Sequence, residues 1–504
     1  MNIRKSPLIS LSMIVKNEEK YLKECLDSVK DIVDEIVIVD TGSTDSTLKI
    51  ANEYGARLYQ FEWINDFSAA RNYALSKSKG EWILYLDADE RITNESRKII
   101  QDTIENLNKP ILVGLRCLVN SIDEKNGKPK LMGYTRLFKN SQEICFHGKV
   151  HEQIEGSLIS CGYSIMDTDI EIIHVGYNIH LDGIKEKASR NLELLLDEYK
   201  ENKSSYYAFH LGNTYEILED YENAFRFFNK ALEDKNLNVA YRSICYLNIA
   251  DYYNSELFDA NLAEKAINDG LSCDPQNPLL NLLAAQIYFK SGDLDKAISF
   301  CRNSLVNNEK LKTTKKNNSI LDIYIEPDKI YSYGLYLSLA NQKINEFDFF
   351  FSRSDQSYQT LISLLLDAKP LLRSDFSRIA SFINKDNLNL FLLLLENRKD
   401  NLAALEILCA VKTKFNDNAK FLIALGNLYY QNGNSDQGIY CLKQSLELKQ
   451  KDPSAVFYLI SILLLQNQIS EIPGWLSFAE KQFGHIPVFK EKFQILLQKL
   501  GAII

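Results

Sequence analysis

Three carboxylates follow a run of apolar residues in the segment WILYLDADE, residues 82–90. Asp87, Asp89 and Glu90 lie so close together that their charges repel one another and resist burial. Two such acids in an Asp-x-Asp turn offer hard oxygen ligands, which suit Mg²⁺ or Mn²⁺. A divalent ion bridging a diphosphate would offset the repulsion and stabilise charge on a nucleoside-diphosphate leaving group.

An isolated Asp-x-Asp pattern is more often a solvated acidic turn, so the surrounding elements decide between the two interpretations. A helix over 66–80 is predicted, with Asp66 as its N-cap. Strands alternating with helices predict a parallel sheet, whose ligands bind beyond the carboxyl ends of the strands. Asp40 and Asp87 both fall at such ends. The predicted strands cover residues 8–15, 35–40, 56–61 and the segment from 82.

The pattern changes twice after the Asp-x-Asp turn. From about residue 111 to 175, strands joined by turn-rich pieces predict a mixed sheet flanking the first one. After about residue 180 the chain becomes helical, and 208–232 and 422–446 share an L-G-N-x-Y phrase, with a looser copy at 283–305. These segments fit the tetratricopeptide pattern, in which small and aromatic residues pack between helices. Its key positions here are Gly212, Tyr215, Ala224, Phe228 and Ala231.

The pattern as a whole predicts five segments along the chain. Residues 326–400 are helical but match the repeat poorly. The expected segments are an α/β domain over 1–180, a connecting helix over 181–204, repeats over 205–309, a linker or exposed loop over 310–325, and a helical region with repeat-like pairs over 326–504.

The bulk composition narrows the class of protein. A chain of 504 residues is too long for one core. A net charge of −9 without a long basic run makes a nucleic-acid partner unexpected. Nine scattered cysteines without a CxxC pair indicate a reducing compartment. No signal peptide is recognised, and the longest apolar stretch, 455–465, is too short for a membrane span, so we expect a cytoplasmic protein. A homo-oligomer is compatible with this composition.

Four motifs in order resemble family 2 glycosyltransferases with the GT-A fold, over about the first 175 residues. The motifs are SMIVKNEEKYLKECLDSV, EIVIVDTGSTDST, DFSAARNYAL and WILYLDADE. The resemblance implies an α/β GT-A domain, Rossmann-like with a mixed sheet. It also implies inverting, metal-dependent transfer of a hexose or N-acetylhexosamine from a UDP-sugar.

The resemblance also implies a role for each matching residue. Asp40 would accept a hydrogen bond from the nucleotide base, Glu18 would lie at the edge of the nucleotide pocket, and Arg71 would contact the base or the diphosphate. Asp87 would hold the ribose or a metal-bound water, and Asp89 the metal. Structural alternatives remain: Glu18 could favour a helix N-terminus, Arg71 could be a surface cation, and Asp40 could be a helix cap.

The segment FHGKVHEQI, residues 146–154, is expected on the acceptor side. His147 and His151 stand four apart, but the HExxH spacing of a zinc protease is missing. Inversion needs a base for the acceptor proton, and a carboxylate can serve. Glu152 is the candidate, with Glu90 in reserve, and an exposed strand acid is the alternative.

A late histidine in similar enzymes completes the metal shell or touches the diphosphate. His174 in HVGY, residues 174–177, is the candidate ligand, and a core histidine is the alternative.

Two other functions compete with a glycosyltransferase. Phosphatases of the haloacid-dehalogenase type also end a strand in Asp-x-Asp, but they carry Thr or Val where Arg91 stands. A non-catalytic repeat scaffold would not need the acidic motif. Phosphate-loop and GxGxxG fingerprints are absent from the sequence.

The repeats indicate the acceptor. Tetratricopeptide arrays present a concave groove for peptides, and Asn213 and Asn427 fall where such a groove is lined. We expect a protein or peptide acceptor modified on Ser, Thr or Cys. The alternative is a lipid-linked or polysaccharide acceptor, with the repeats used for assembly.

Overall fold

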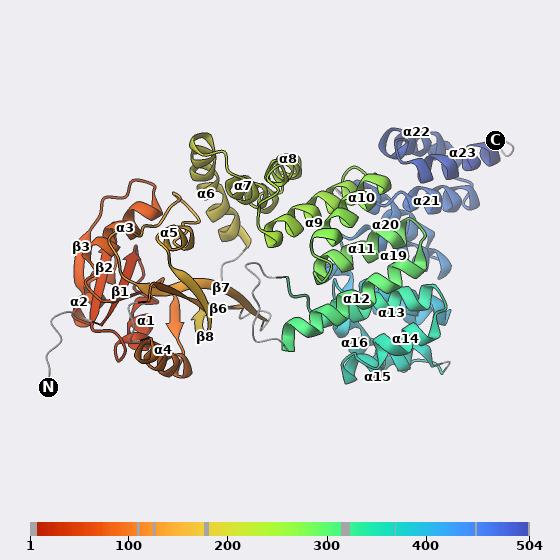
Figure 1. The fold of residues 1–504 in the computed structure, drawn as a ribbon. Coiled ribbons are helices and arrows are strands. Elements are labelled where there is room, and N and C mark those ends of the chain that lie inside the picture. The colour runs from red at the N-terminus through yellow and green to blue at the C-terminus, as the bar shows by residue number, and fades with distance from the viewer. Residues whose placement is uncertain are drawn as a thin grey trace. The chain divides into compact units, whose positions relative to one another are not determined.

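The computed structural model describes residues 8–107, 111–123, 128–175, 181–313, 323–367, 369–448 and 451–501 (Figure 1). The chain divides into two compact units, one of residues 1–283 and 306–324 and the other of residues 284–305 and 325–504. Gly176 and Tyr177 of the HVGY motif lie outside the described residues, as do 314–322 of the expected linker.

The first unit contains one mixed sheet of eight strands in the order β3-β2-β1-β4-β7-β6-β8-β5 (Figure 1). The first four strands are parallel neighbours, as predicted. The strands expected to flank this sheet instead extend it, because β7 pairs antiparallel with β4. The α/β fold class with a mixed sheet is confirmed. The strands are β1 (Ile9–Val15), β2 (Glu35–Asp40), β3 (Arg57–Gln60), β4 (Trp82–Tyr85), β5 (Glu90–Ile92), β6 (Val113–Asp123), β7 (Lys128–Lys139) and β8 (Ser164–His174).

The helix before β4 ends at Lys77, earlier than in the prediction that places Gly80 just past its end. Asp66 caps its N-terminus by accepting a hydrogen bond from the Ala69 N–H at 2.9 Å, as predicted. At Gly80 a Cβ atom would lie 2.5 Å from the Ser10 nitrogen, so glycine lets the chain enter β4 close against β1. The helices packed around the sheet are α1 (Leu22–Val29), α2 (Thr47–Glu53), α3 (Phe67–Lys77), α4 (Asn94–Asn106) and α5 (Glu155–Ser160).

The remainder of the chain is helical, which confirms the second part of the expected fold class. The helices of the first unit and the segment up to Thr313 are α6 (Leu181–Glu201), α7 (Ser205–Ile217), α8 (Tyr221–Leu232), α9 (Val239–Ser255), α10 (Ala260–Cys273), α11 (Pro278–Lys290) and α12 (Leu294–Thr313). In α7, a Cβ atom on Gly212 would lie 2.6 Å from the Phe228 ring of α8. The small and aromatic positions therefore make the interhelical contact that the repeat pattern predicts.

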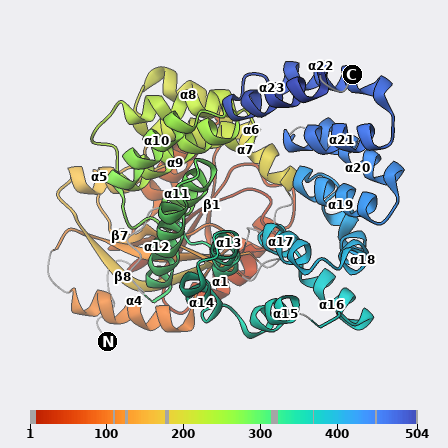
Figure 2. The same ribbon diagram turned by 90° about the vertical axis from the view of Figure 1, so that its right-hand side faces the viewer.

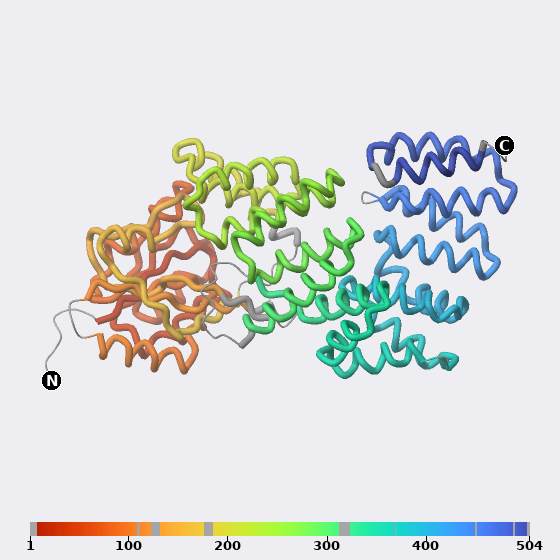
Figure 3. The backbone as a smooth tube through the Cα atoms, turned by 45° about the vertical axis from the view of Figure 1, so that its right-hand side comes forward, coloured from red at the N-terminus to blue at the C-terminus, as the bar shows by residue number. Residues whose placement is uncertain are grey.

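Helix pairs also follow one another in the second unit (Figures 2 and 3). Its later helices are α13 (Pro327–Ala340), α14 (Ile344–Phe351), α15 (Gln356–Leu366), α16 (Arg373–Phe382), α17 (Leu388–Arg398), α18 (Asn401–Val411), α19 (Ala419–Gln431), α20 (Ser435–Glu447), α21 (Ser454–Leu465), α22 (Ile472–Phe483) and α23 (Pro487–Gly501). Gly334 of α13 lies directly against the Phe350 ring of α14, so this pair packs like α7 and α8. Within the described residues, every helix is too short or too polar to cross a membrane.

Candidate active site

The three carboxylates after β4 form a tight turn at the carboxyl end of the parallel strands. The Glu90 N–H donates to the Asp87 carbonyl at 3.0 Å, and the Asp87 N–H donates to Glu90 Oε2 at 2.9 Å. The buried Cys25 thiol lies 3.5 Å from the same Asp87 carbonyl. The turn is therefore held by its own backbone and by α1.

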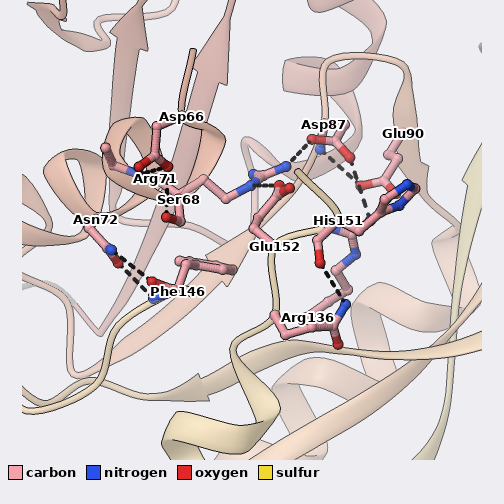
Figure 4. Close-up of polar contacts among 12 residues, drawn as sticks. Asp66, Ser68, Arg71, Asn72, Asp87, Glu90, Arg136, Phe146, His151 and Glu152 are labelled. Carbon is pink, nitrogen blue, oxygen red and sulfur yellow. Dashed lines mark hydrogen bonds and ion pairs between the residues drawn. The ribbon is translucent and has the colours of Figure 1, made fainter. Parts of the chain in front are cut away.

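Two arginines meet these acids from other elements (Figure 4). Arg71 of α3 donates through Nη2 to Asp87 Oδ1 at 2.7 Å. Arg136 of β7 donates to Glu90 Oε1 at 2.6 Å, and its Nη2 lies 3.6 Å from Asp87 Oδ2. Both arginine side chains are about nine-tenths buried. The protein itself thus offsets part of the repulsion among the acids.

The pKa values of the acids in and near the turn are shifted in different directions. Burial alone would raise the pKa of Asp87, but Arg71 and Arg136 hold that pKa well below its usual range. Burial raises the pKa of Glu90, with Asp87 adding to the effect and Arg136 opposing it. For the half-buried Glu18, burial together with Asp89 and Asp87 raises the pKa to about 7. Glu18 therefore lies within electrostatic reach of both aspartates.

Asp89 and His174, the two predicted metal ligands, are brought together. His174 ends β8, which pairs with β5 so that His174 lies opposite Glu90. Its Nε2 is 3.1 Å from Asp89 Oδ2, and its Nδ1 is 3.1 Å from the Ser121 hydroxyl. Burial lowers the pKa of His174, but the hydrogen bond and charge of Asp89 together with the charges of Glu90 and Asp87 raise the pKa overall.

This pair fits a divalent ion that takes its remaining ligands from substrate and water. One carboxylate and one imidazole are suitable donors for Mn²⁺ or Mg²⁺. Among the residues that the structure describes, no group of three or more His, Cys, Asp or Glu side chains could hold a metal ion.

Glu152 also contacts Arg71, through a different nitrogen from the one that contacts Asp87 (Figure 4). Arg71 Nε donates to Glu152 Oε1 at 2.5 Å, and the Glu152 side chain is 15% exposed. The alternatives of a surface cation for Arg71 and of an exposed acid for Glu152 are therefore wrong. His147 is exposed, and its Nε2 lies 3.2 Å from Cys145 Sγ, away from this network.

Asp40 makes its hydrogen bonds within its own turn, and the two predicted groove residues are on helices of different units. Asp40 is 3% exposed at the end of β2 and accepts hydrogen bonds from the Gly42 N–H at 3.2 Å and the Ser43 N–H at 3.0 Å. Its carboxylate shapes the turn, and helix α2 has Ser46 as its N-cap, so Asp40 is not a helix cap. Asn213 is on α7, in the first unit, and Asn427 is on α19, in the second.

Arg136 was not identified from the sequence. It sits in GYTRLF, where a single cation occurs in an otherwise strand-like run. A charge at a buried strand position needs a partner. The single arginine in this run was therefore the sequence signal that could have identified Arg136 as a site residue. The partner itself depends on the register of β7 against β4, in which Leu137 lies opposite Leu84.

Comparison with known proteins gives separate matches for the N-terminal sheet domain and for the helical repeats. Residues 10–170 match the profile described as Glycosyl transferase family 2. Three segments, 205–233, 279–305 and 419–452, match the tetratricopeptide repeat profile.

Two curated bacterial proteins are similar over part of their length. A TPR repeat-containing protein of Synechococcus elongatus is 33% identical over 46% of this chain and 59% of its own length. The SPbeta prophage-derived glycosyltransferase SunS of Bacillus subtilis is 30% identical over 45% of this chain and 54% of its own length. This chain thus spans little more than half the length of these relatives.

Solved structures resemble the chain only distantly. Residues 1–349 of S. aureus TarS in complex with UDP-GlcNAc align over 61% of this chain and 92% of that chain, with 16% identity and a TM-score of 0.30. A tetratricopeptide repeat protein from Parabacteroides merdae aligns over 59% of this chain and all of its own length, with 13% identity and a TM-score of 0.38.

Proposed function

We propose that this chain, whose residues 10–170 match the glycosyltransferase family 2 profile and precede segments that match the tetratricopeptide repeat profile, is an inverting protein glycosyltransferase. It moves a hexose or N-acetylhexosamine from a UDP-sugar to Ser, Thr or Cys of a protein or peptide. The observation that carries the proposal is the arrangement around Arg71, which forms ion pairs with both Asp87 and Glu152. A donor-side acid and an acceptor-side acid thus lie within one cation's reach.

The donor side of the site suits a nucleoside diphosphate. Asp89 and His174 would hold Mn²⁺ or Mg²⁺, which supplies positive charge for the diphosphate when bound. Asp40 and Glu18 would border the nucleotide. Asp40 lies on β2 and Asp87 follows β4, and these strands flank β1 with their carboxyl ends at one edge of the sheet. Ligands of parallel sheets bind at that edge.

The reaction is a single displacement at the anomeric carbon. The acceptor oxygen or sulfur attacks that carbon while its bond to the UDP oxygen breaks, and the electron pair leaves with UDP. Glu152 takes the acceptor proton. Arg71 orients the Glu152 carboxylate through Nε, and its guanidinium also holds Asp87 in place. The family 2 relatives and the acidic turn both support this chemistry.

The acceptor groove is proposed in the second unit. A pocket of 630 Å³ is lined by α17 and α19, with Leu393 and Ile423 among its apolar residues and Asn389, Asn427 and Gln431 among its polar ones. In the described part of the chain these three side-chain amides make no hydrogen bond to protein. Amides free to bond can pair with peptide N–H and C=O groups, while the apolar residues receive side chains. Asn213 would line the corresponding face of the first repeat.

A cytoplasmic reaction is the accompanying proposal. All nine cysteines are free of disulfides in the structure, although several are close to the surface. Free cysteines of this kind are typical of a reducing compartment.

Donor hydrolysis tests the activity. The purified chain is incubated with a panel of UDP-sugars, with and without Mn²⁺ or chelator, and released UDP is measured. We expect Mn²⁺-stimulated hydrolysis of at least one donor and a loss of about a hundredfold or more in Asp89→Ala. Asp102→Ala, an exposed acid on α4, is the matched control. Activity that ignores chelator and Asp89→Ala would refute the metal site, and failure to bind or cleave any nucleotide sugar would refute the glycosyltransferase.

The peptide groove is tested separately. The ratio of glycosylation of a peptide library containing Ser, Thr and Cys to donor hydrolysis is compared between wild type and Asn427→Ala. We expect the ratio to fall about tenfold, because one peptide hydrogen bond in an apolar surrounding is lost. Asn397→Ala, an exposed asparagine of α17 outside the pocket, is the control. An unchanged ratio would contradict the groove and favour a lipid-linked or polysaccharide acceptor.

A further inference from the structure

The segment of residues 147–153, here called the Glu152 loop, is closed at its base. His147 and Gln153 exchange both backbone hydrogen bonds, at 3.0 and 2.9 Å. Between them, Glu152 faces Arg71 and the sheet domain. The other face of the loop meets helices α6 and α7, which lie beyond the residues of the glycosyltransferase match. All of these elements belong to the same compact unit.

Helix α7 contacts the residue directly before Glu152. The Tyr206 hydroxyl donates to the His151 carbonyl at 3.1 Å. One helical turn further on, the His210 ring stacks on the His151 ring, with centroids 4.2 Å apart and planes at 15°. The backbone and the side chain of His151 are thus both held by the first tetratricopeptide helix.

The backbone of His151 is left-handed. Its φ is +54°, in a region that is uncommon for residues other than glycine and that asparagine, aspartate and histidine adopt more often than other side chains do. A change to an ordinary φ would turn the direction of the next side chain, Glu152. The contacts from α7 therefore hold the residue whose backbone conformation sets the direction of the proposed base.

The other end of the loop is held in the same way. Gly148 has φ +99°, and the Tyr207 hydroxyl lies 2.9 Å from the place where a Cβ atom would sit. The Lys149 N–H donates to Glu198 Oε2 of α6 at 3.2 Å, and its Nζ pairs with Glu201 at 3.1 Å. Helices α6 and α7 thus contact both bends of the Glu152 loop.

From these contacts we infer that the first tetratricopeptide hairpin is part of the active site. Tyr206 and His210 are positioning residues that hold His151 and thereby aim Glu152 at the acceptor. The inference rests on the proposed function, because it takes Glu152 as the base. It adds that the repeats act on the chemical step itself, in addition to any role in binding an acceptor.

The rates expected for a residue that positions Glu152 differ from those expected for a residue that only binds the acceptor. Water replaces the acceptor in donor hydrolysis and also needs its proton removed, so a misaimed Glu152 slows hydrolysis and glycosylation by the same factor. A variant that only weakens acceptor binding changes their ratio. Tyr206→Phe removes one hydroxyl and keeps the ring, and we expect kcat of both reactions to fall about twofold to tenfold, with KM for the donor unchanged.

The experiment is a double-mutant cycle between residues 206 and 152. Tyr206→Phe, Glu152→Gln and the double variant are assayed for donor hydrolysis, and UDP binding by calorimetry reports an intact donor site. We expect Tyr206→Phe to have no further effect on the Glu152→Gln protein, because the group that it positions is already lost. Tyr215→Phe is the matched control: it is on the same helix, and its ring packs on Phe227.

The outcomes distinguish the inference from the proposed function. Equal kcat for Tyr206→Phe and Tyr215→Phe, or independent effects of Tyr206→Phe and Glu152→Gln, would overturn the positioning role. His210→Ala removes the stacked ring, and an unchanged rate of hydrolysis in this variant would count against the positioning role in the same way. If Glu152→Gln itself leaves kcat unchanged while Asp89→Ala abolishes it, the assignment of the base fails instead. If wild type cleaves no nucleotide sugar, the proposed function fails as a whole.

Discussion

Replacing Arg136 with methionine should destabilise the sheet domain strongly. The Arg136 and Glu90 side chains are 10% and 1% exposed and lie 2.6 Å apart. Removing one partner of such a pair leaves an uncompensated buried charge, which costs about 3–5 kcal/mol. The pair is too deeply buried for solvent screening to reduce this figure much. The variant also loses the packing of the guanidinium over the Tyr85 ring, 4.5 Å from its centroid.

The loss of stability caused by Arg136→Met should depend on pH in a defined direction. Burial raises the pKa of Glu90 from the model-compound value of 4.5 to about 7, although Arg136 lowers it, and loss of Arg136 raises it further. Below about pH 4.5 Glu90 is protonated in the folded and unfolded states alike. As the pH rises through about 7, wild-type Glu90 ionises beside Arg136, whereas the variant must bury an unpaired carboxylate or keep the proton. The destabilisation therefore grows from pH 5.5 to pH 8.5.

Denaturant unfolding at these two pH values measures the effect. Tryptophan fluorescence reports the transition, because Trp82 is buried in β4 of the same sheet. The control is Arg116→Met. Arg116 pairs with the partly exposed Glu155 and Asp167, so we expect a loss of about 1 kcal/mol or less without this pH trend. A loss below 1 kcal/mol for Arg136→Met at both pH values, or a larger loss at pH 5.5, would refute the reasoning.

Three further outcomes follow from single contacts. Glu152→Gln should lower kcat for glycosylation about 10²- to 10⁴-fold in steady-state assays, since the proton acceptor is removed; a change of less than tenfold contradicts its role as base. Gly334→Ala should lower the melting temperature, at a cost of about 1–3 kcal/mol, because the added methyl meets Phe350. Gly474→Ala, with open space at the Cβ position, is its control, and equal melting temperatures would count against the packing argument. Asp66→Ala should cost about 1 kcal/mol in denaturant unfolding through loss of the α3 cap, and a neutral result would contradict a stabilising role for this cap.

The sequence was most informative where local signals suffice. The first four strands, the Asp66 cap and the turn after β4 follow from periodicity and capping chemistry, which act over a few residues. Asp89 and His174 were paired through the family resemblance, and the antiparallel β5–β8 register then places them together. The continuation of the sheet through β7 was missed, because pairing between β4 and β7 leaves no local trace.

Contacts between distant segments explain the other omissions. Arg136 reaches the acidic turn only through strand register, and Tyr206 and His210 reach the Glu152 loop only through the packing of α7. The repeat-like packing of Gly334 on Phe350 was available in principle, since their spacing equals that of Gly212 and Phe228. The surrounding residues of 326–400 obscured it, because the L-G-N-x-Y phrase is missing there.

The grip of α6 and α7 on the Glu152 loop also bears on protein engineering. Domain boundaries are best cut where few contacts cross, and the family match alone would place a junction shortly after residue 170. Glu198 and Tyr206 lie beyond that junction and hold the loop from outside. A chimera that exchanges the repeat array should therefore keep the native chain through α8 and join the foreign repeats after Leu232.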